Sequence, residues 1–271
     1  MSDLSQKLAK VGRAPARLSR DAWLLRHVEN WREALIAEWT HTPLKQVRMR
    51  NGVVLESPPT IDLAFLFYET WLRRIYSPPG YEIGSGETII DIGANIGVFA
   101  TFAATQAPEV RVFSYEPFPE NVEYLRNNVD KSGLTNVKVF QQAVSGDTGV
   151  RYLQVNSANW IVHSLFGEST TTEPGLPIDS VSFDDIMIKE GIESCDLLKL
   201  DCEGSEYEIL QRCNPDTLSR VRRIVGEFHE GPHIHGTGED LCRFLESRSF
   251  RIDNFKRDDG FGVLSAYNLA F

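Results

Sequence analysis

Hydrophobic positions in the first third of the chain follow a helical spacing and then alternate with polar ones. One stripe of an amphipathic helix is formed by four apolar residues, at Leu24, Val28, Trp31 and Leu35. The dipeptide Asn51-Gly52 separates two alternating runs, which predicts a β-hairpin. A second helix is expected over residues 61–76. Residues 1–85 are therefore expected to form a cap made of a helix, a hairpin and a helix.

From residue 86 onward, short apolar runs alternate with amphipathic segments. We expect strands at 88–92, 110–115, 137–141, 151–155, 196–200, 221–228, 250–255 and 262–269. We expect helices at 96–106, 119–132, 182–189, 205–212 and 238–247. Strands that alternate with helices indicate an α/β fold with a doubly wound, mostly parallel sheet. Residues 256–261 are too short a link for a parallel crossover, so the last strand is expected to be antiparallel.

A glycine turn follows the first strand of this region, in the run Asp91-Ile92-Gly93-Ala94-Asn95-Ile96-Gly97. Gly93 allows a tight turn next to a ligand, and Gly97 allows the following helix to start close to the sheet. The dinucleotide fingerprint GxGxxG is absent, because Asn95 and Val98 stand where it requires glycine. A carboxylate at Asp91 would repel a pyrophosphate but suits a ligand with an ammonium group and no phosphate. S-adenosylmethionine is such a ligand.

An acidic residue, Glu116, ends the second strand, 19 residues after Gly97. An acid at this position accepts hydrogen bonds from both ribose hydroxyls of a bound nucleoside. Enzymes that use NAD and enzymes that use S-adenosylmethionine share this geometry, so it indicates an adenosine site. Pro117 and Phe118 follow directly, and Phe118 lies either near the adenine or in the core. Backbone groups around Ala143, after the third strand, are expected to reach the adenine edge.

A second motif, Asp201-x-Glu203-Gly204-x-Glu206, stands at the tip of the strand at 196–200. Together with the run from Asp91 to Gly97 and with Glu116-Pro117, it resembles the FkbM-type methyltransferase family, over residues 86–230. The resemblance implies a class I methyltransferase (Rossmann-like) fold and S-adenosylmethionine as the methyl donor. It also implies an acceptor hydroxyl on a small molecule, a sugar or a lipid-linked glycan. Residues 86–271 would then form the catalytic domain.

The resemblance also assigns positions around the cofactor. The methionine part would be surrounded by Asp91, Gly93, Asn95 and Gly97, and the ribose would be held by Glu116. Asp201 would face the sulfonium and the acceptor. The sequence leaves open whether Glu203 or Glu206 reaches the site.

Methylation of an alcohol requires removal of the hydroxyl proton, so a base must stand beside the acceptor. Glu227 and His229 lie two residues apart at the end of the strand 221–228 and point the same way. His229 titrates nearest neutral pH, so we expect it to be the base, with help from Glu227. Asp201 would orient the cofactor or the acceptor. His163 is an alternative base, within residues 156–180, which we expect to be a long loop covering the active site.

A metal site is a second interpretation of the histidines at 229, 233 and 235. Gly231-Pro232 prevents a helical pair of histidines, and the spacing matches no zinc signature. We therefore assign no metal ligands, although a divalent cation held with oxygen ligands from Glu227, Glu230 and Asp201 stays an alternative.

Composition narrows the remaining function classes. The net charge of −10 argues against a nucleic-acid partner. The apolar runs are too short for a membrane span and no signal pattern is present, so a cytoplasmic location is expected. The aromatic segment 23–39 is a candidate homodimer surface. A nicotinamide-dependent oxidoreductase and a non-catalytic adenosine-binding module are the alternative functions.

Overall fold

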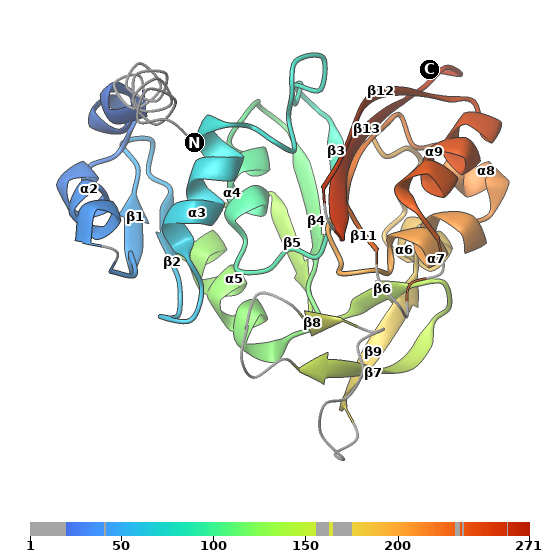
Figure 1. The fold of residues 1–271 in the computed structure, drawn as a ribbon, viewed down its shortest axis with the longest axis horizontal. Helices are drawn as coiled ribbons and strands as arrows, with labels where there is room; N and C mark the ends of the chain where they lie inside the picture. The colour runs from blue at the N-terminus through green and yellow to red at the C-terminus, as the bar shows by residue number, and fades with distance from the viewer. Residues whose placement is uncertain are drawn as a thin grey trace, which may run out of the picture.

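The computed structural model describes residues 20–40, 42–155, 163–164, 175–230, 234, 236–258 and 260–271. Its centre is a seven-stranded sheet in the order β12-β13-β11-β10-β3-β4-β5 (Figure 1). The strands are β3 (Thr88–Ile92), β4 (Arg111–Tyr115), β5 (Val137–Phe140), β10 (Leu197–Leu200), β11 (Arg223–His229), β12 (Phe250–Arg257) and β13 (Phe261–Asn268). All pairings are parallel except those of β13, which runs antiparallel to both β11 and β12. The predicted doubly wound sheet with an antiparallel last strand is confirmed.

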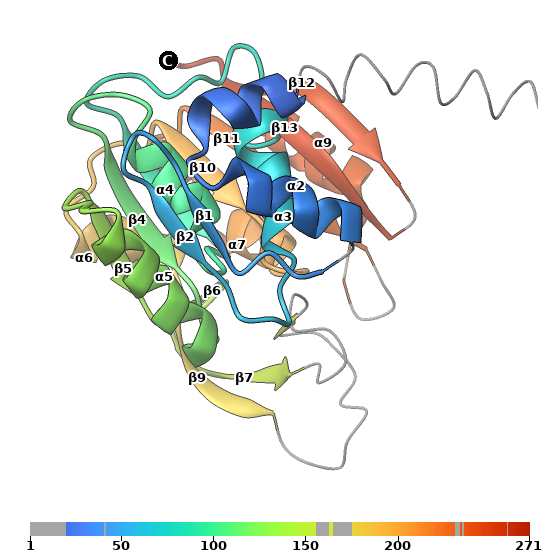
Figure 2. The same cartoon turned by 90° about the vertical axis from the view of Figure 1, so that its left-hand side faces the viewer.

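Helices cover both faces of the sheet, as Figures 1 and 2 show. On one face, α4 (Val98–Ala104) and α5 (Pro119–Lys131) pack with the N-terminal cap. On the other face lie α6 (Phe183–Lys189), α7 (Glu206–Arg212), α8 (Pro215–Leu218) and α9 (Gly238–Ser247). Because side chains alternate along a strand, Ile89 enters the first core and Ile90 the second. The carboxyl ends of the parallel strands stay free to form a site.

The cap differs from its prediction in its first helix, which is interrupted. Residues 20–27 are helical, Val28 pairs with Met49 in an isolated bridge, and the chain then enters α2 (Trp31–Thr40). Asn30 fixes the break, since its side chain accepts from the backbone N–H of Arg48 at 2.8 Å. The single continuous helix is therefore wrong, because a tertiary pairing replaces one turn.

The rest of the cap follows its prediction more closely. The hairpin joins β1 (Gln46–Arg48) to β2 (Val54–Glu56) in antiparallel register, as expected. The second helix is shorter than predicted, with one α-helical part, α3 (Leu63–Phe67), and one π-helical part, η1 (Tyr68–Leu72). It ends well before residue 76, which leaves Tyr76 free to enter the site.

Asn128 of α5 holds the cap on the sheet domain. Its side chain accepts from the backbone N–H of Glu56 at 2.8 Å and donates to the carbonyl of Glu56 at 3.0 Å. It also donates to the carbonyl of Ile96 at 2.8 Å. Cap residues such as Val28 and Leu55 share one core with this face of the sheet. The division at residue 85 stays a prediction.

A second, four-stranded sheet of order β6-β9-β7-β8 lies beside the main one (Figure 1). Its strands are β6 (Ala143–Ser145), β7 (Gly149–Val155), β8 (His163–Ser164) and β9 (Leu176–Ser182). The predicted loop at 156–180 is thus partly wrong, since β8 and the start of β9 fall within it. Pro177 and neighbouring polar residues hide the alternation by which Ile178 and Ser180 are buried. Residues 156–162 and 165–174 lie outside the described residues.

Two further predictions concern a membrane span and a dimer surface. None of the described helices is long and apolar enough to span a bilayer. On α2, Ile36 and Trp39 are exposed, whereas Trp23 stacks on His27. The homodimer through this segment stays a prediction.

Candidate active site

The glycine turn packs directly against the end of β10. Gly93 has a positive φ of 75°, and a Cβ added there would overlap the backbone oxygen of Asp201. The N–H groups of Gly93 and Ala94 both donate to the carbonyl of Tyr115 at 3.0 Å. Only glycine therefore allows the turn to lie this close to Asp201. The cofactor turn and the second motif share one wall.

Glu116 ties the turn to the end of β4. Its carboxylate accepts from the backbone N–H of Asn95 at 2.8 Å and from that of Phe118 at 3.0 Å. Asn121 donates to it at 3.4 Å. Burial raises the pKa of Glu116, whereas these donors lower it. Glu116 lines the cleft and is held rigidly, which suits the predicted ribose contact.

Asp91 lies beneath the turn and not at its surface. Its side chain is fully buried, 3.2 Å from the ammonium of Lys199. Lys199 also donates to the carbonyl of Gly93 at 2.6 Å. Burial raises the pKa of Asp91, whereas the charge of Lys199 lowers it. Asp91 therefore supports the turn from inside through Lys199 and is not among the residues that line the cleft. Its predicted contact with the cofactor stays a prediction.

A cleft of about 960 Å³ opens above this wall. Its lining includes most of the residues predicted for cofactor and acceptor: Gly93, Asn95, Glu116, Pro117, Ala143, Asp201, Glu227 and His229. Gly97 and Phe118 are absent from the lining. Gly97 packs against Leu125, and Phe118 is buried in a small core with Ala143. Contact of Phe118 with the adenine stays a prediction. The volume is in the upper range for small-molecule sites.

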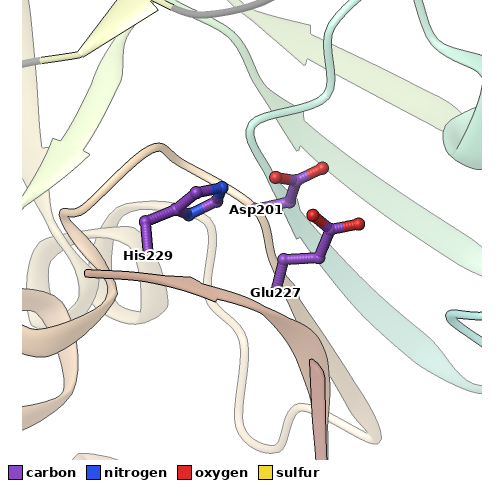
Figure 3. A group of neighbouring side chains, drawn as sticks. All are labelled: Asp201, Glu227 and His229. Atoms are coloured by element: carbon purple, nitrogen blue, oxygen red, sulfur yellow. The ribbon is translucent and has the colours of Figure 1, made fainter. Parts of the chain in front are cut away.

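Three side chains converge on the floor of the cleft (Figure 3). Asp201 follows β10, and Glu227 and His229 stand on β11; one ligand atom from each lies within 4.8 Å of the others. Parallel pairing of Leu200 with Gly226 places Asp201 beside Glu227. The structure thus brings together the three residues that the sequence singled out for catalysis.

Tyr76 reaches this group from the cap. Its hydroxyl donates to Oδ2 of Asp201 at 2.8 Å and also contacts Oε1 of Glu227 at 3.2 Å. Burial, followed by the charge of Asp201, raises the pKa of Glu227 to about 7. Burial also raises the pKa of Glu203, which lines the cleft, to about 7. Carboxyl groups are therefore crowded at the floor.

His229 is held by Glu206, which the sequence left unassigned. Nδ1 of His229 lies 3.0 Å from Oε1 of Glu206, and Nε2 lies 3.5 Å from Glu203. Burial alone would lower the pKa of His229, but Glu206, Glu203 and Asp201 raise it to about 10. The imidazole therefore holds its proton at neutral pH. It is poorly suited to act alone as the base predicted from the sequence.

Glu206 is a structural residue of the second motif. It is 1% exposed and accepts from the backbone N–H groups of Cys202 and Gly204, both at 2.9 Å. The alternative base His163 stands on β8, and its side chain lies outside the described part of the chain. His233 and His235 also lie outside it.

The sequence interpretation missed Tyr76 and Lys199. Lys199 did carry a signal: a charged residue inside the apolar run Leu197–Leu200, two positions before Asp201 and so on the same face. Tyr76 carried none, because only the folding of the cap brings it to the site.

The order of the strands, the glycine turn after β3 and the acidic residue at the end of β4 together define a class I methyltransferase fold. The chain belongs to the FkbM methyltransferase family, since the family profile described as methyltransferase FkbM domain matches residues 91–252.

The chain is also similar to two methyltransferases by sequence and to one solved methyltransferase structure. The 31-O-demethyl-FK506 methyltransferase FkbM of Streptomyces tacrolimicus is 26% identical over 77% of this chain and 90% of its own length. The hexuronic acid methyltransferase AglP of Haloferax volcanii is 25% identical over 67% of this chain and 72% of its own length. A solved structure of magnesium protoporphyrin IX methyltransferase from Synechocystis PCC 6803 with bound SAM has a TM-score of 0.46 and 12% identity, over 76% of this chain and 82% of that chain.

Proposed function

We propose that this protein uses S-adenosylmethionine to methylate a hydroxyl group of a small molecule or sugar. One observation carries the proposal: the glycine turn and the group Asp201, Glu227 and His229 share one cleft floor, with Gly93 packed against Asp201. A nucleoside held by the turn would place its reactive end beside that group. The names of two relatives, a 31-O-demethyl-FK506 and a hexuronic acid methyltransferase, support a hydroxyl-bearing acceptor.

Cofactor binding would use the turn and the end of β4. Glu116 would accept from the ribose, while Gly93 and Asn95 would present backbone groups to the methionine part. The carboxylates of Asp201 and Glu227 favour a positively charged ligand, and the sulfonium supplies that charge. A pyrophosphate would meet the same carboxylates, which opposes the alternative of a nicotinamide cofactor.

Methyl transfer then requires alignment and proton removal. The acceptor oxygen attacks the methyl carbon, an O–C bond forms, and the S–C bond breaks to leave S-adenosylhomocysteine. The hydroxyl proton must leave at the same time. We assign its removal to the group Asp201, Glu227 and His229 acting together, because His229 by itself holds its proton in the free protein.

Calorimetric titration with S-adenosylhomocysteine tests the cofactor part. We expect one site per chain, lost on Glu116→Ala, together with no response to NADH. Formation of S-adenosylhomocysteine with a panel of uronic acids, deoxysugars and macrocyclic alcohols tests the transfer. Failure to bind S-adenosylhomocysteine refutes the proposal, and binding without turnover on any acceptor favours the non-catalytic adenosine-binding module.

A further inference from the structure

We propose that Asp201, Glu227 and His229 bind a divalent cation on the floor of the cleft, and that this cation in turn binds the acceptor hydroxyl. The second half of this inference rests on the proposed function. The first half, a cation site, rests only on the residues and their geometry.

The arrangement of the three side chains supports a shared ligand. They come from neighbouring parallel strands, and Figure 3 shows them pointing toward one another. Their ligand atoms all lie within 4.8 Å of one another, so small torsional adjustments bring them onto one cation. Tyr76 fixes both carboxylates by contacts of 2.8 and 3.2 Å. The set is therefore nearly preorganised.

The histidine is oriented as a metal ligand is. Its Nδ1 faces the buried carboxylate of Glu206 at 3.0 Å, and its Nε2 lies 3.5 Å from Glu203, a residue of the cleft lining, so Nε2 is the nitrogen left for a cation. Metal-binding histidines usually donate their second ring nitrogen to a carboxylate or carbonyl in this way. Glu206 is itself anchored by two backbone N–H groups, so the ring has a rigid support.

The negative charge of the two carboxylates and one hydroxyl left unpaired in the described part of the cleft also favour a bound cation. The ammonium of Lys199 lies 3.8 Å from Asp201, but it lies closer to Asp91, at 3.2 Å, and to the carbonyl of Gly93. This ammonium is therefore shared between Asp91 and the carboxylates of the floor, and it does not balance Asp201 and Glu227 by itself. In addition, Ser205 lines the cleft, and its buried hydroxyl has no hydrogen-bond partner among the described residues. A hydrated cation would supply both charge and a water ligand.

The donor set selects the class of cation. One imidazole nitrogen and two carboxylates suit a first-row ion such as Mn²⁺ and leave positions for water and for an acceptor oxygen. An acceptor hydroxyl on such an ion loses its proton more readily. That proton passes to a carboxylate oxygen of Asp201 or Glu227 and from there to water, as the O–C bond forms and the S–C bond of the sulfonium breaks, so His229 does not have to act as the base.

Titration of the chelator-treated, full-length protein with MnCl₂ tests the site, with calorimetry and electron paramagnetic resonance as readouts. We expect one Mn²⁺ per chain and proton release, seen as a dependence of the heat on buffer ionisation enthalpy. Asp201→Asn and His229→Gln are each expected to weaken Mn²⁺ binding more than 10-fold. Glu206→Gln is expected to weaken it about 10- to 100-fold through the orientation of the ring.

Two control variants remove a carboxylate and an imidazole at positions outside the proposed cation site. Asp216→Asn removes an exposed carboxylate on α8, and His27→Gln removes a histidine of the cap; both are expected to bind Mn²⁺ as the unchanged protein does. Circular dichroism and urea unfolding report whether each variant is folded.

The outcomes separate the two proposals. Millimolar Mn²⁺ without saturable binding, or equal binding by folded Asp201→Asn and His229→Gln, overturns the cation site. If S-adenosylhomocysteine binds while Mn²⁺ does not, the proposed function stands without the cation. If Mn²⁺ binds and the cofactor does not, the cation site stands and the proposed function fails. Full turnover in excess EDTA would refute the role of the cation in transfer.

Discussion

The Nδ1 atom of His229 lies 3.0 Å from Oε1 of Glu206, a carboxylate that is only 1% exposed. This contact joins β11 to the first residue of α7, the helix that follows the loop after β10. Because the same carboxylate also accepts from two backbone N–H groups of that loop, one side chain fixes both the turn and the imidazole. The second motif is therefore organised around Glu206, while Asp201 faces the cleft.

Replacing Glu206 by glutamine tests this relationship. The amide offers one acceptor oxygen where the carboxylate has two, so a buried N–H group loses its partner. We expect the free energy of unfolding to fall by about 1–3 kcal/mol, measured by urea denaturation. Glu208→Gln, two positions further along the same helix but partly exposed, is the control, with a change below about 0.5 kcal/mol. Equal effects of the two substitutions would contradict the assignment.

Lys199 and Asp91 form a buried pair beneath the glycine turn. Lys199→Met leaves the Asp91 carboxyl without its counter-charge, so we expect a loss of about 3–5 kcal/mol in the free energy of unfolding. In the double variant with Asp91→Asn, no charge of the pair remains, and part of the loss should be recovered. A double-mutant cycle on urea unfolding measures this coupling. Strictly additive effects would show that the pair is not coupled.

Gly93 is required for the shape of the cofactor turn. Gly93→Ala puts a Cβ on the backbone oxygen of Asp201, so the turn must move and S-adenosylhomocysteine affinity should fall more than 10-fold in calorimetry. Gly133→Ala is the matched control: its φ is also positive, at 63°, but the added Cβ meets nothing within 4 Å. It should cost about 1 kcal/mol of stability and leave cofactor affinity unchanged. Normal cofactor affinity of Gly93→Ala would refute the role of the turn.

The central sheet was predictable because its signal is local. Apolar runs alternate with capped helices, and every strand from β3 to β5 and from β10 to β13 lies within a few residues of its predicted bounds. The errors have long-range causes. Pairing of Val28 with Met49 breaks a helix whose own pattern is continuous, and β9 is a strand because it pairs with β6 and β7.

In the candidate site, too, some residues are predictable from local signals and others depend on long-range contacts. Asp201, Glu227 and His229 stand at strand ends, so the fold alone predicts that they meet. The role of Asp91 could not be read from the sequence, because it depends on which face of β3 meets Lys199. Tyr76 is separated from Asp201 by 125 residues, and only cap docking brings the two together.

The hairpin of the cap gives a pH-dependent prediction. Lys131, by its hydrogen bond and charge, holds the pKa of Glu56 below its usual value. A lowered pKa stabilises the fold above the unfolded pKa of about 4.3, and this contribution disappears as the pH falls through the folded pKa. Lys131→Met should therefore lower the free energy of unfolding at pH 7 by less than about 1 kcal/mol, since the pair is partly exposed. In urea titrations from pH 7 to pH 3, the difference should shrink toward zero; a constant difference would point to packing by the lysine stem.

The hydroxyl of Tyr76 links the cap to Asp201 and Glu227 on the floor of the cleft, and Tyr76→Phe removes it with little change of shape. Without it, Asp201 and Glu227 lose a shared contact, so we expect kcat with a working acceptor to fall about 10- to 100-fold through misplacement. The dissociation constant of S-adenosylhomocysteine should change less than about 3-fold, because the glycine turn and Glu116 are untouched. Tyr81→Phe makes the same change in the same segment, but its hydroxyl donates to Asp253, so kcat should be unaffected. If both variants lose kcat equally, the cap acts through its stability, and the specific role of Tyr76 is wrong.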